Sequence, residues 1–128
     1  MRFWIALLLI PFSFLANGQD YFKDFTFTKA DTLRGALNPA RTCYDVVFYD
    51  LLIELDPEER FIKGSNKIHF TAIENFNKLQ IDLFPEMSIS KILYQGNELK
   101  FERNYNAINI AFPMVKKGLK SSFEVFFQ

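Results

Sequence analysis

The chain has 128 residues, enough for one ordinary domain and too few for two. Its 15 basic and 15 acidic side chains cancel, and neither kind is clustered in the sequence. This argues against the basic patch that a nucleic-acid partner would need, and against a charged helix lying on a membrane surface.

The first 18 residues have the pattern of a secretory signal peptide. A positive start, Met1-Arg2, precedes the uncharged apolar residues 3–15, and Ala16-Asn17-Gly18 supplies the small residues of a cleavage site. A membrane anchor is the alternative, but 13 apolar residues interrupted by Pro11 are too short to cross a bilayer of about 30 Å. We therefore predict an exported protein, periplasmic or secreted, with no membrane span after cleavage.

Residues 19–40 show no sustained period, and we interpret them as an N-terminal arm. Within them, Leu33, Leu37 and Pro39 are typical of a loop or a short turn of helix. Strand-like alternation begins after this arm, so we assign residues 41–128 to a single β-domain.

A long hairpin is predicted between residues 47 and 72. Its two arms alternate with a period of two, and a proline-containing turn at residues 56–60 joins them. We expect one face to be wet, because the two faces differ in polarity. The more apolar face carries Val47, Tyr49, Leu51, Ile53, Leu55, Ile62, Gly64, Asn66, Ile68, Phe70 and Ala72.

Shorter strands follow, at residues 79–83, 89–94, 108–112 and 121–127, with another starting at Leu99. Turns are predicted at Gln95-Gly96-Asn97, at Asn104-Tyr105-Asn106 and at Lys116-Lys117-Gly118. These elements indicate an antiparallel all-β fold, a sheet or sandwich built of hairpins, and local turns favour a meander. The last strand runs to Gln128 without a turn, so we expect a truncated sequence whose sheet is incomplete at the C-terminus.

Residues 41–127 resemble the start of the aminopeptidase N-like zinc metallopeptidases, which include the leukotriene hydrolases. The family pattern Y-x-L-x-(I/L)-x-(L/V)-D is matched by residues 49–56, and G-x-x-x-I-x-F by residues 64–70. The strand pattern L-x-(I/L)-D-L is matched by residues 79–83. Residues 89–96, residues 107–113 and the Lys117-Gly118 turn are similar to later parts of the same domain.

The resemblance implies a saddle-shaped β-domain that packs on a thermolysin-like catalytic domain, the expected partner. It also implies an enzyme that hydrolyses N-terminal residues from peptides, with Zn held by H-E-x-x-H and a later glutamate. A G-x-M-E-N segment would bind the free amino terminus of the substrate. Both motifs are missing: His69, the only histidine, is followed by Phe70, and Gly35-Ala36-Leu37-Asn38 lacks the glutamate. We therefore expect no catalytic, cofactor-binding or metal-binding residue here, and no activity of this chain alone.

Other chemistry-bearing residues have structural interpretations. Cys43, the only cysteine, cannot form an internal disulfide and is interpreted as a small, partly buried apolar side chain. We expect His69 on the polar side of its strand, and the Glu58-Glu59 pair in a solvated turn. The alternative function is a free-standing exported β-sandwich that binds a protein or a glycan through aromatic side chains. Its candidate residues are Tyr44, Tyr49, Tyr94 and Tyr105.

Overall fold

The computed structural model describes residues 26–128. The predicted signal peptide at residues 1–18 and the first part of the predicted arm lie outside the described residues. Two short helices precede eight strands. The elements are α1 (Lys29–Gly35), α2 (Pro39–Thr42), β1 (Tyr44–Asp56), β2 (Phe61–Ala72), β3 (Phe76–Asp82), β4 (Ile89–Tyr94), β5 (Asn97–Glu98), β6 (Phe101–Asn104), β7 (Ala107–Val115) and β8 (Lys120–Phe127).

The two helices begin at residues that cap them. Thr28 accepts a hydrogen bond from the Asp31 amide while the Asp31 carboxylate accepts one from the Thr28 amide, which is a capping box for α1. Asn38 caps α2, and Pro39 follows it at the first helical turn, where its missing N–H has no cost. No helix among residues 26–128 is long and apolar enough to cross a membrane.

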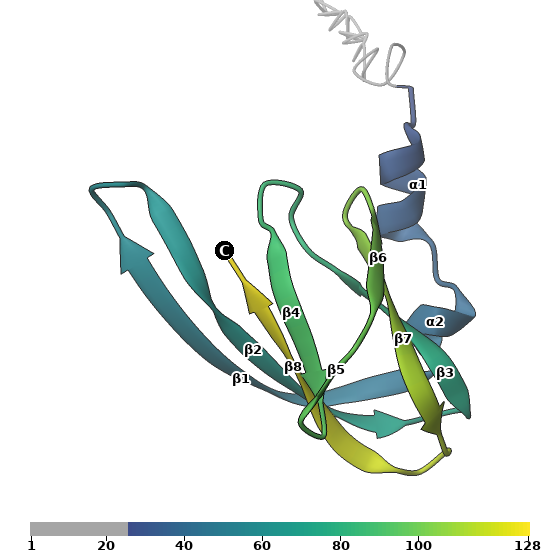
Figure 1. Ribbon diagram of the computed structural model, residues 1–128. Coiled ribbons are helices and arrows are strands. Elements are labelled where there is room, and N and C mark those ends of the chain that lie inside the picture. Colours follow the sequence, from purple (N-terminus) through teal and green to yellow (C-terminus); the bar gives the residue numbers. More distant parts are fainter. Residues whose placement is uncertain (1–25) are drawn as a thin grey trace, which may run out of the picture.

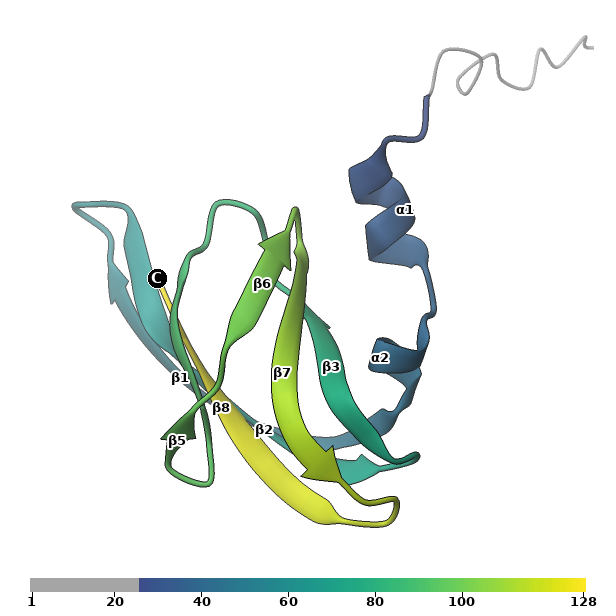
Figure 2. The same ribbon diagram turned by 45° about the vertical axis from the view of Figure 1, so that its right-hand side comes forward.

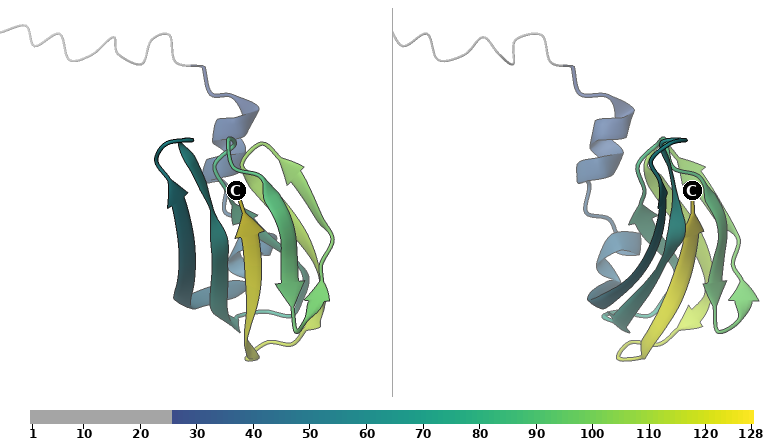
Figure 3. Two further views of the ribbon diagram at one scale, coloured as in Figure 1. Left: turned by 60° about the vertical axis from the view of Figure 1, so that its left-hand side comes forward. Right: turned by 90° about the vertical axis from the view of Figure 1, so that its left-hand side faces the viewer.

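The strands form two antiparallel sheets, as the all-β prediction required. One sheet has the order β1-β2-β8-β4-β5 and the other has the order β3-β7-β6. Figure 1 and Figure 2 show the sheets close together at one end and diverging toward the other, while Figure 3 shows the larger sheet. The predicted meander is wrong, because β3 leaves the sheet of β2 and because β8 inserts between β2 and β4.

The predicted turns lie between the observed strands. Gln95 and Gly96 both have positive φ in the two-residue connection from β4 to β5, as a type I′ hairpin turn requires. Gly118 has a φ of +84° between β7 and β8, a conformation that glycine adopts without strain. At the tip of the β1–β2 hairpin, the Asp56 carboxylate accepts hydrogen bonds from the Glu58 and Glu59 amides.

Aromatic rings from both sheets form the core. Phe70 on β2 and Phe123 on β8 are each 1% exposed, and their ring centroids are 5.9 Å apart. Phe112 on β7 meets Phe123 at 5.4 Å and Tyr94 on β4 at 5.1 Å, in both cases edge to face. Such pairs contribute about 0.5–1.5 kcal/mol each beyond the burial of their area. These contacts join the three-stranded sheet to the five-stranded one.

The far half of the β1–β2 hairpin projects away from the three-stranded sheet, as Figure 1 shows. The pairing register places Tyr49 opposite the buried Ile68, and therefore puts Tyr49, Leu51, Ile53 and Leu55 on the same face of the sheet as the core. We call these four residues the exposed β1 face, because they are 56%, 54%, 45% and 68% exposed. Alternation correctly grouped them on one side, but the opposite sheet is too short to cover them.

The C-terminal strand has a different place from the one expected. β8 pairs with β2 on one side and with β4 on the other, so it is an interior strand. The edges of the larger sheet are β1 and the short β5. Residues 120–127 are therefore not an edge strand of this sheet.

Gly64 provides a test of the close approach between β1 and β2. A Cβ built there would collide with the carbonyl oxygen of Leu52. We expect Gly64→Ala to lower the free energy of unfolding by about 1–3 kcal/mol, because backbone has to move to admit one methyl group. Urea unfolding followed by circular dichroism measures this loss. In the control Gly118→Asn the site is open and Asn tolerates positive φ, so equal losses in both variants would contradict the prediction.

Candidate functional site

The two residues with nucleophile or base chemistry are not brought together. Cys43 is 4% exposed in the core, with its sulfur 3.5 Å from the Ala40 carbonyl oxygen. Burial raises the pKa of the Cys43 thiol, which keeps it neutral. His69 is half-buried on the face of β2 that points away from the core, and its ring is 5.7 Å from that of Phe48. The sequence interpretation of Cys43 as a packing residue agrees with this geometry.

Acidic residues do not gather into a site either. Glu58 and Glu59 are exposed in the hairpin turn, as predicted, and their amides serve the turn itself. Across residues 26–128, no group of three or more His, Cys, Asp and Glu side chains is arranged to hold a metal ion. The described part of the chain therefore offers no ligand set for zinc.

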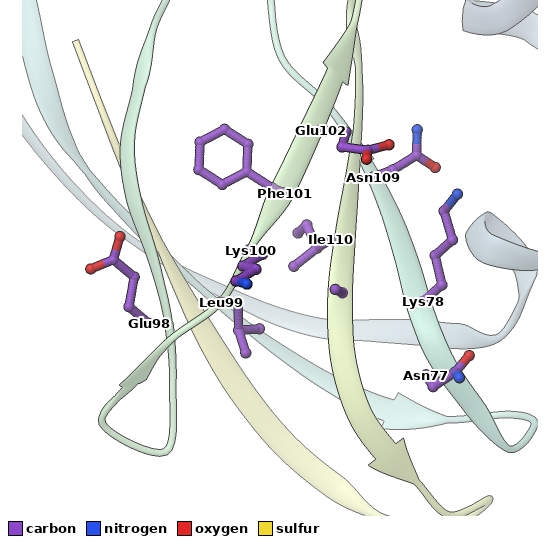
Figure 4. Close-up of a pocket in the computed structure, with 10 residues that line it drawn as sticks. Asn77, Lys78, Glu98, Leu99, Lys100, Phe101, Glu102, Asn109 and Ile110 are labelled. Carbon is purple, nitrogen blue, oxygen red and sulfur yellow. The ribbon is translucent and has the colours of Figure 1, made fainter.

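An open hollow of about 970 Å³ lies on the three-stranded sheet. Figure 4 shows it between β3, β6 and β7, with Glu102 beside Asn109 and Lys78 extending along β3. Charges of both signs line it, including Glu98 and Lys100. It contains no serine, cysteine or histidine, and the carboxylates and ammonium groups that line it are exposed to solvent.

A polar network that the sequence did not reveal fastens α2 to β3. The Asn38 amide donates to the Gln80 side chain at 2.8 Å, and Gln80 donates to Asp82 at 3.3 Å. Asp82 forms an ion pair with Arg41, and the Tyr44 hydroxyl donates to the Gln80 carbonyl oxygen at 2.9 Å. Gln80 is 4% exposed, so these bonds satisfy polar groups that would otherwise be costly to bury.

Next to this network a groove of about 550 Å³ separates β1 and β2 from β3. Its wall combines apolar side chains such as Phe127 with the polar Tyr49, Asn66 and Asp82. The buried Asn66 side-chain oxygen has no hydrogen-bond partner among the described residues. An unsatisfied buried acceptor costs about 1–3 kcal/mol, so a group that entered the groove with an N–H donor would recover this energy.

The four candidate tyrosines do not form a common binding patch. Tyr94 is 5% exposed in the core, and Tyr44 is engaged in the polar network. Of these four, Tyr49 on β1 and Tyr105 in the turn between β6 and β7 are exposed, and these elements belong to different sheets. The tyrosines that the sequence suggested for glycan or protein binding are therefore not clustered.

The exposed β1 face is the strongest candidate for a functional surface. Its four apolar side chains continue the core face of the sheet past the last residues that the other sheet covers. Contiguous exposed apolar surface of this kind marks sites of association in folded proteins. The alternation of these residues is evident from the sequence, but the sequence has no signal for how far the opposing sheet reaches.

Comparisons with known proteins bear on the fold. No family model matches the sequence, and no curated protein matches it. Among solved structures, the chain is similar to an M1 zinc metallopeptidase from Deinococcus radiodurans, with a TM-score of 0.61 and 18% identity over 69% of this chain and 21% of that chain. A mutant two-domain M1 zinc metallopeptidase bound to L-arginine gives the same values.

The fold is shared with part of the M1 zinc metallopeptidases. This confirms, for the fold, the resemblance that the ordered strand motifs indicated. The matched region spans about a fifth of the length of those proteins, 21% in both comparisons. Most of an M1 metallopeptidase thus has no counterpart in the matched residues.

Tyr44 makes the domain sensitive to alkali. Burial, with smaller effects from Tyr49 and Cys43, raises the pKa of Tyr44 to about 12, above the ordinary value of 10. Because the folded state keeps this proton longer than the unfolded state, the full stability is present below pH 10 and is lost between pH 10 and about 12. We expect the loss to be about 2 kcal/mol from this group.

Urea unfolding at a series of pH values from 8 to 12 measures that slope. The variant Tyr44→Phe keeps the ring and removes the ionisation, so its slope should be smaller than that of the wild type. The buried Cys43 thiol supplies a residual slope of the same sign in both proteins. Identical slopes in both proteins would contradict the assignment to Tyr44.

Proposed function

We propose that this chain is the N-terminal, non-catalytic domain of an exported zinc aminopeptidase, and that it acts by packing against a catalytic domain. The catalytic partner would hold the zinc and hydrolyse N-terminal residues from peptides. This chain would contribute a wall beside the active-site domain. The proposal is supported by the fold shared with M1 zinc metallopeptidases over 69% of the chain.

The exposed β1 face is the observation that carries the packing role. Four neighbouring apolar side chains are 45% to 68% exposed. While they face water, the domain lacks the stabilisation that their burial would provide. Covering them would contribute about 25 cal/mol for each Å² of apolar area removed from solvent. A companion domain could use the same contact to enter the adjacent groove and to donate a hydrogen bond to the unpartnered Asn66 oxygen.

The inventory of reactive groups supports the non-catalytic role. The chain has one histidine and one cysteine. Cys43 follows α2 and lies in the core, whereas His69 lies on the face of β2 opposite to the core residue Phe70, and the motif H-E-x-x-H is missing from the sequence. Nothing in this arrangement activates water or a nucleophile.

The chain alone should not release amino acids from peptides. Purified chain is incubated with Zn²⁺ and aminoacyl 4-nitroanilides, and release of nitroaniline is followed by absorbance. We expect no rate above the buffer blank, because no zinc ligands or general base converge. Zinc-dependent release that disappears on chelation and scales with the amount of chain would overturn the proposal.

The companion domain can be sought in the DNA that follows the codon of Gln128. We expect the same frame, a shifted frame or a neighbouring gene to encode H-E-x-x-H and a later glutamate. Co-expression of that product with this chain should give a complex that co-purifies. If no such sequence lies nearby, the pairing with a catalytic domain fails, and an exported binding module becomes the better account.

A further inference from the structure

The outer edge of β1 is open. Among the described residues, β1 pairs only with β2 and forms one border of the five-stranded sheet. A bulge between Val46 and Phe48 interrupts its start, and the hairpin turn follows Asp56. Between these two irregularities residues 48–56 run as regular strand. Their outward backbone N–H and C=O groups are a template for another strand.

This edge has only part of the usual protection against pairing. Natural edges carry charged residues, especially lysine, or proline, a bulge or a short strand. β1 has a bulge near its start and three acids within residues 48–56, but it is 13 residues long and has neither lysine nor proline. Exposed apolar side chains lie on both of its faces. The exposed β1 face lies on one side, while Phe48 and Leu52 lie on the other and are 60% and 70% exposed.

We propose that β1 pairs antiparallel with β1 of a second copy of this chain, about a two-fold axis at Leu51. A two-fold axis perpendicular to the sheet places residues of the same face opposite one another, so each such register is centred on one residue. Centring on Leu51 sets Tyr49 opposite Ile53 of the second copy and Asp50 opposite Leu52. Phe48 then lies opposite Glu54.

The distribution of acidic residues selects this register. A centre at residue 50 puts Asp50 opposite itself, and a centre at residue 52 puts it opposite Glu54. A centre at residue 53 puts Asp50 opposite Asp56. Like charges directly opposite one another destabilise a strand pair. Of the centres from 50 to 53, the one at Leu51 alone has no acid facing an acid.

The remaining charges are compatible with this arrangement. Glu54 is bound to Lys63 of its own hairpin, with Nζ and Oε1 3.0 Å apart, and Asp50 lies opposite Lys67 on β2. The acids of each copy therefore have a cation beside them that pairing leaves in place. Pairing at the edge joins two five-stranded sheets into one and leaves the surface of the exposed β1 face available. The dimer is thus independent of the packing on a catalytic domain proposed above.

Cysteine crosslinking tests both the dimer and its register. In the exported form of the chain, Leu51→Cys places two thiols on the two-fold axis, with Cα atoms about 5 Å apart, which suits a disulfide. The matched control Leu52→Cys places its thiols two positions out of register, with Cα atoms about 8 Å apart. Mild oxidation should give a disulfide dimer of the first variant only. Cys43 is buried and does not compete.

Sedimentation of the uncrosslinked chain gives the affinity. We expect a monomer–dimer equilibrium for the wild type, and a dissociation constant raised at least about tenfold by Leu51→Lys, which sets two ammonium groups face to face. Leu52→Lys sets its charge opposite Asp50 of the second copy and should keep the dimer. A wild-type chain that stays monomeric at about 0.1 mM would overturn the proposal, as would equal crosslinking of both cysteine variants.

Discussion

The rings of Phe70, Phe112 and Phe123 hold the two sheets together, and the rest of the domain is arranged around that contact. They come from β2, β7 and β8, and they meet in the core at angles that bring ring edges to ring faces. Each ring contacts the other two, Phe70 and Phe112 also contact Phe76, and Phe112 also contacts Tyr94. The position of this cluster determines where the three-stranded sheet lies over the five-stranded one. It therefore also determines which residues of the larger sheet are left exposed.

The unequal reach of the two sheets follows from strand length. β1 and β2 have 13 and 12 residues, while β3 and β7 have 7 and 9. The long β1–β2 hairpin therefore projects beyond the shorter strands of the other sheet. The apolar side chains at alternate positions of its projecting part are exposed to water. The exposed β1 face is a consequence of this mismatch, whereas the free edge follows from the strand order, in which β1 is a border strand among the described residues. The domain is well packed at one end and has exposed apolar surface at the other.

Local signals in the sequence account for much of the fold. The alternation at residues 62–72 predicts the core face of β2 correctly, and Gln95-Gly96 identifies its turn because two residues there need positive φ. The pairing of β8 between β2 and β4 could not be inferred, because these partners are distant in sequence and no local pattern in residues 120–127 identifies them. The polar network was missed for the same reason: Asn38 and Gln80 are far apart in the sequence, and each alone has the composition of a surface residue.

The candidate surface was foreseen in part. Tyr49, Leu51, Ile53 and Leu55 were grouped on one face by their spacing, which is a local property. Their exposure depends on the length and placement of strands from another part of the chain, and the bulge at residues 46–48 shifted Val47 out of the series. Signals from spacing therefore identified the residues, whereas only the assembled sheets showed that they are uncovered.

The position of β8 also sets the order in which the larger sheet can be completed. Among the described strands it is the last in sequence and the middle one of its sheet, where it pairs with β2 and β4. During synthesis the β1–β2 and β6–β7 hairpins can form as soon as they emerge, because their partners are adjacent. β2 and β4, however, keep unpaired inner edges until residues 120–127 arrive, and closing such distant contacts is slow. Until then the backbone groups at the inner edges of β2 and β4 lack the strand that pairs with them in the folded domain. The pairing of β8 covers both edges at once.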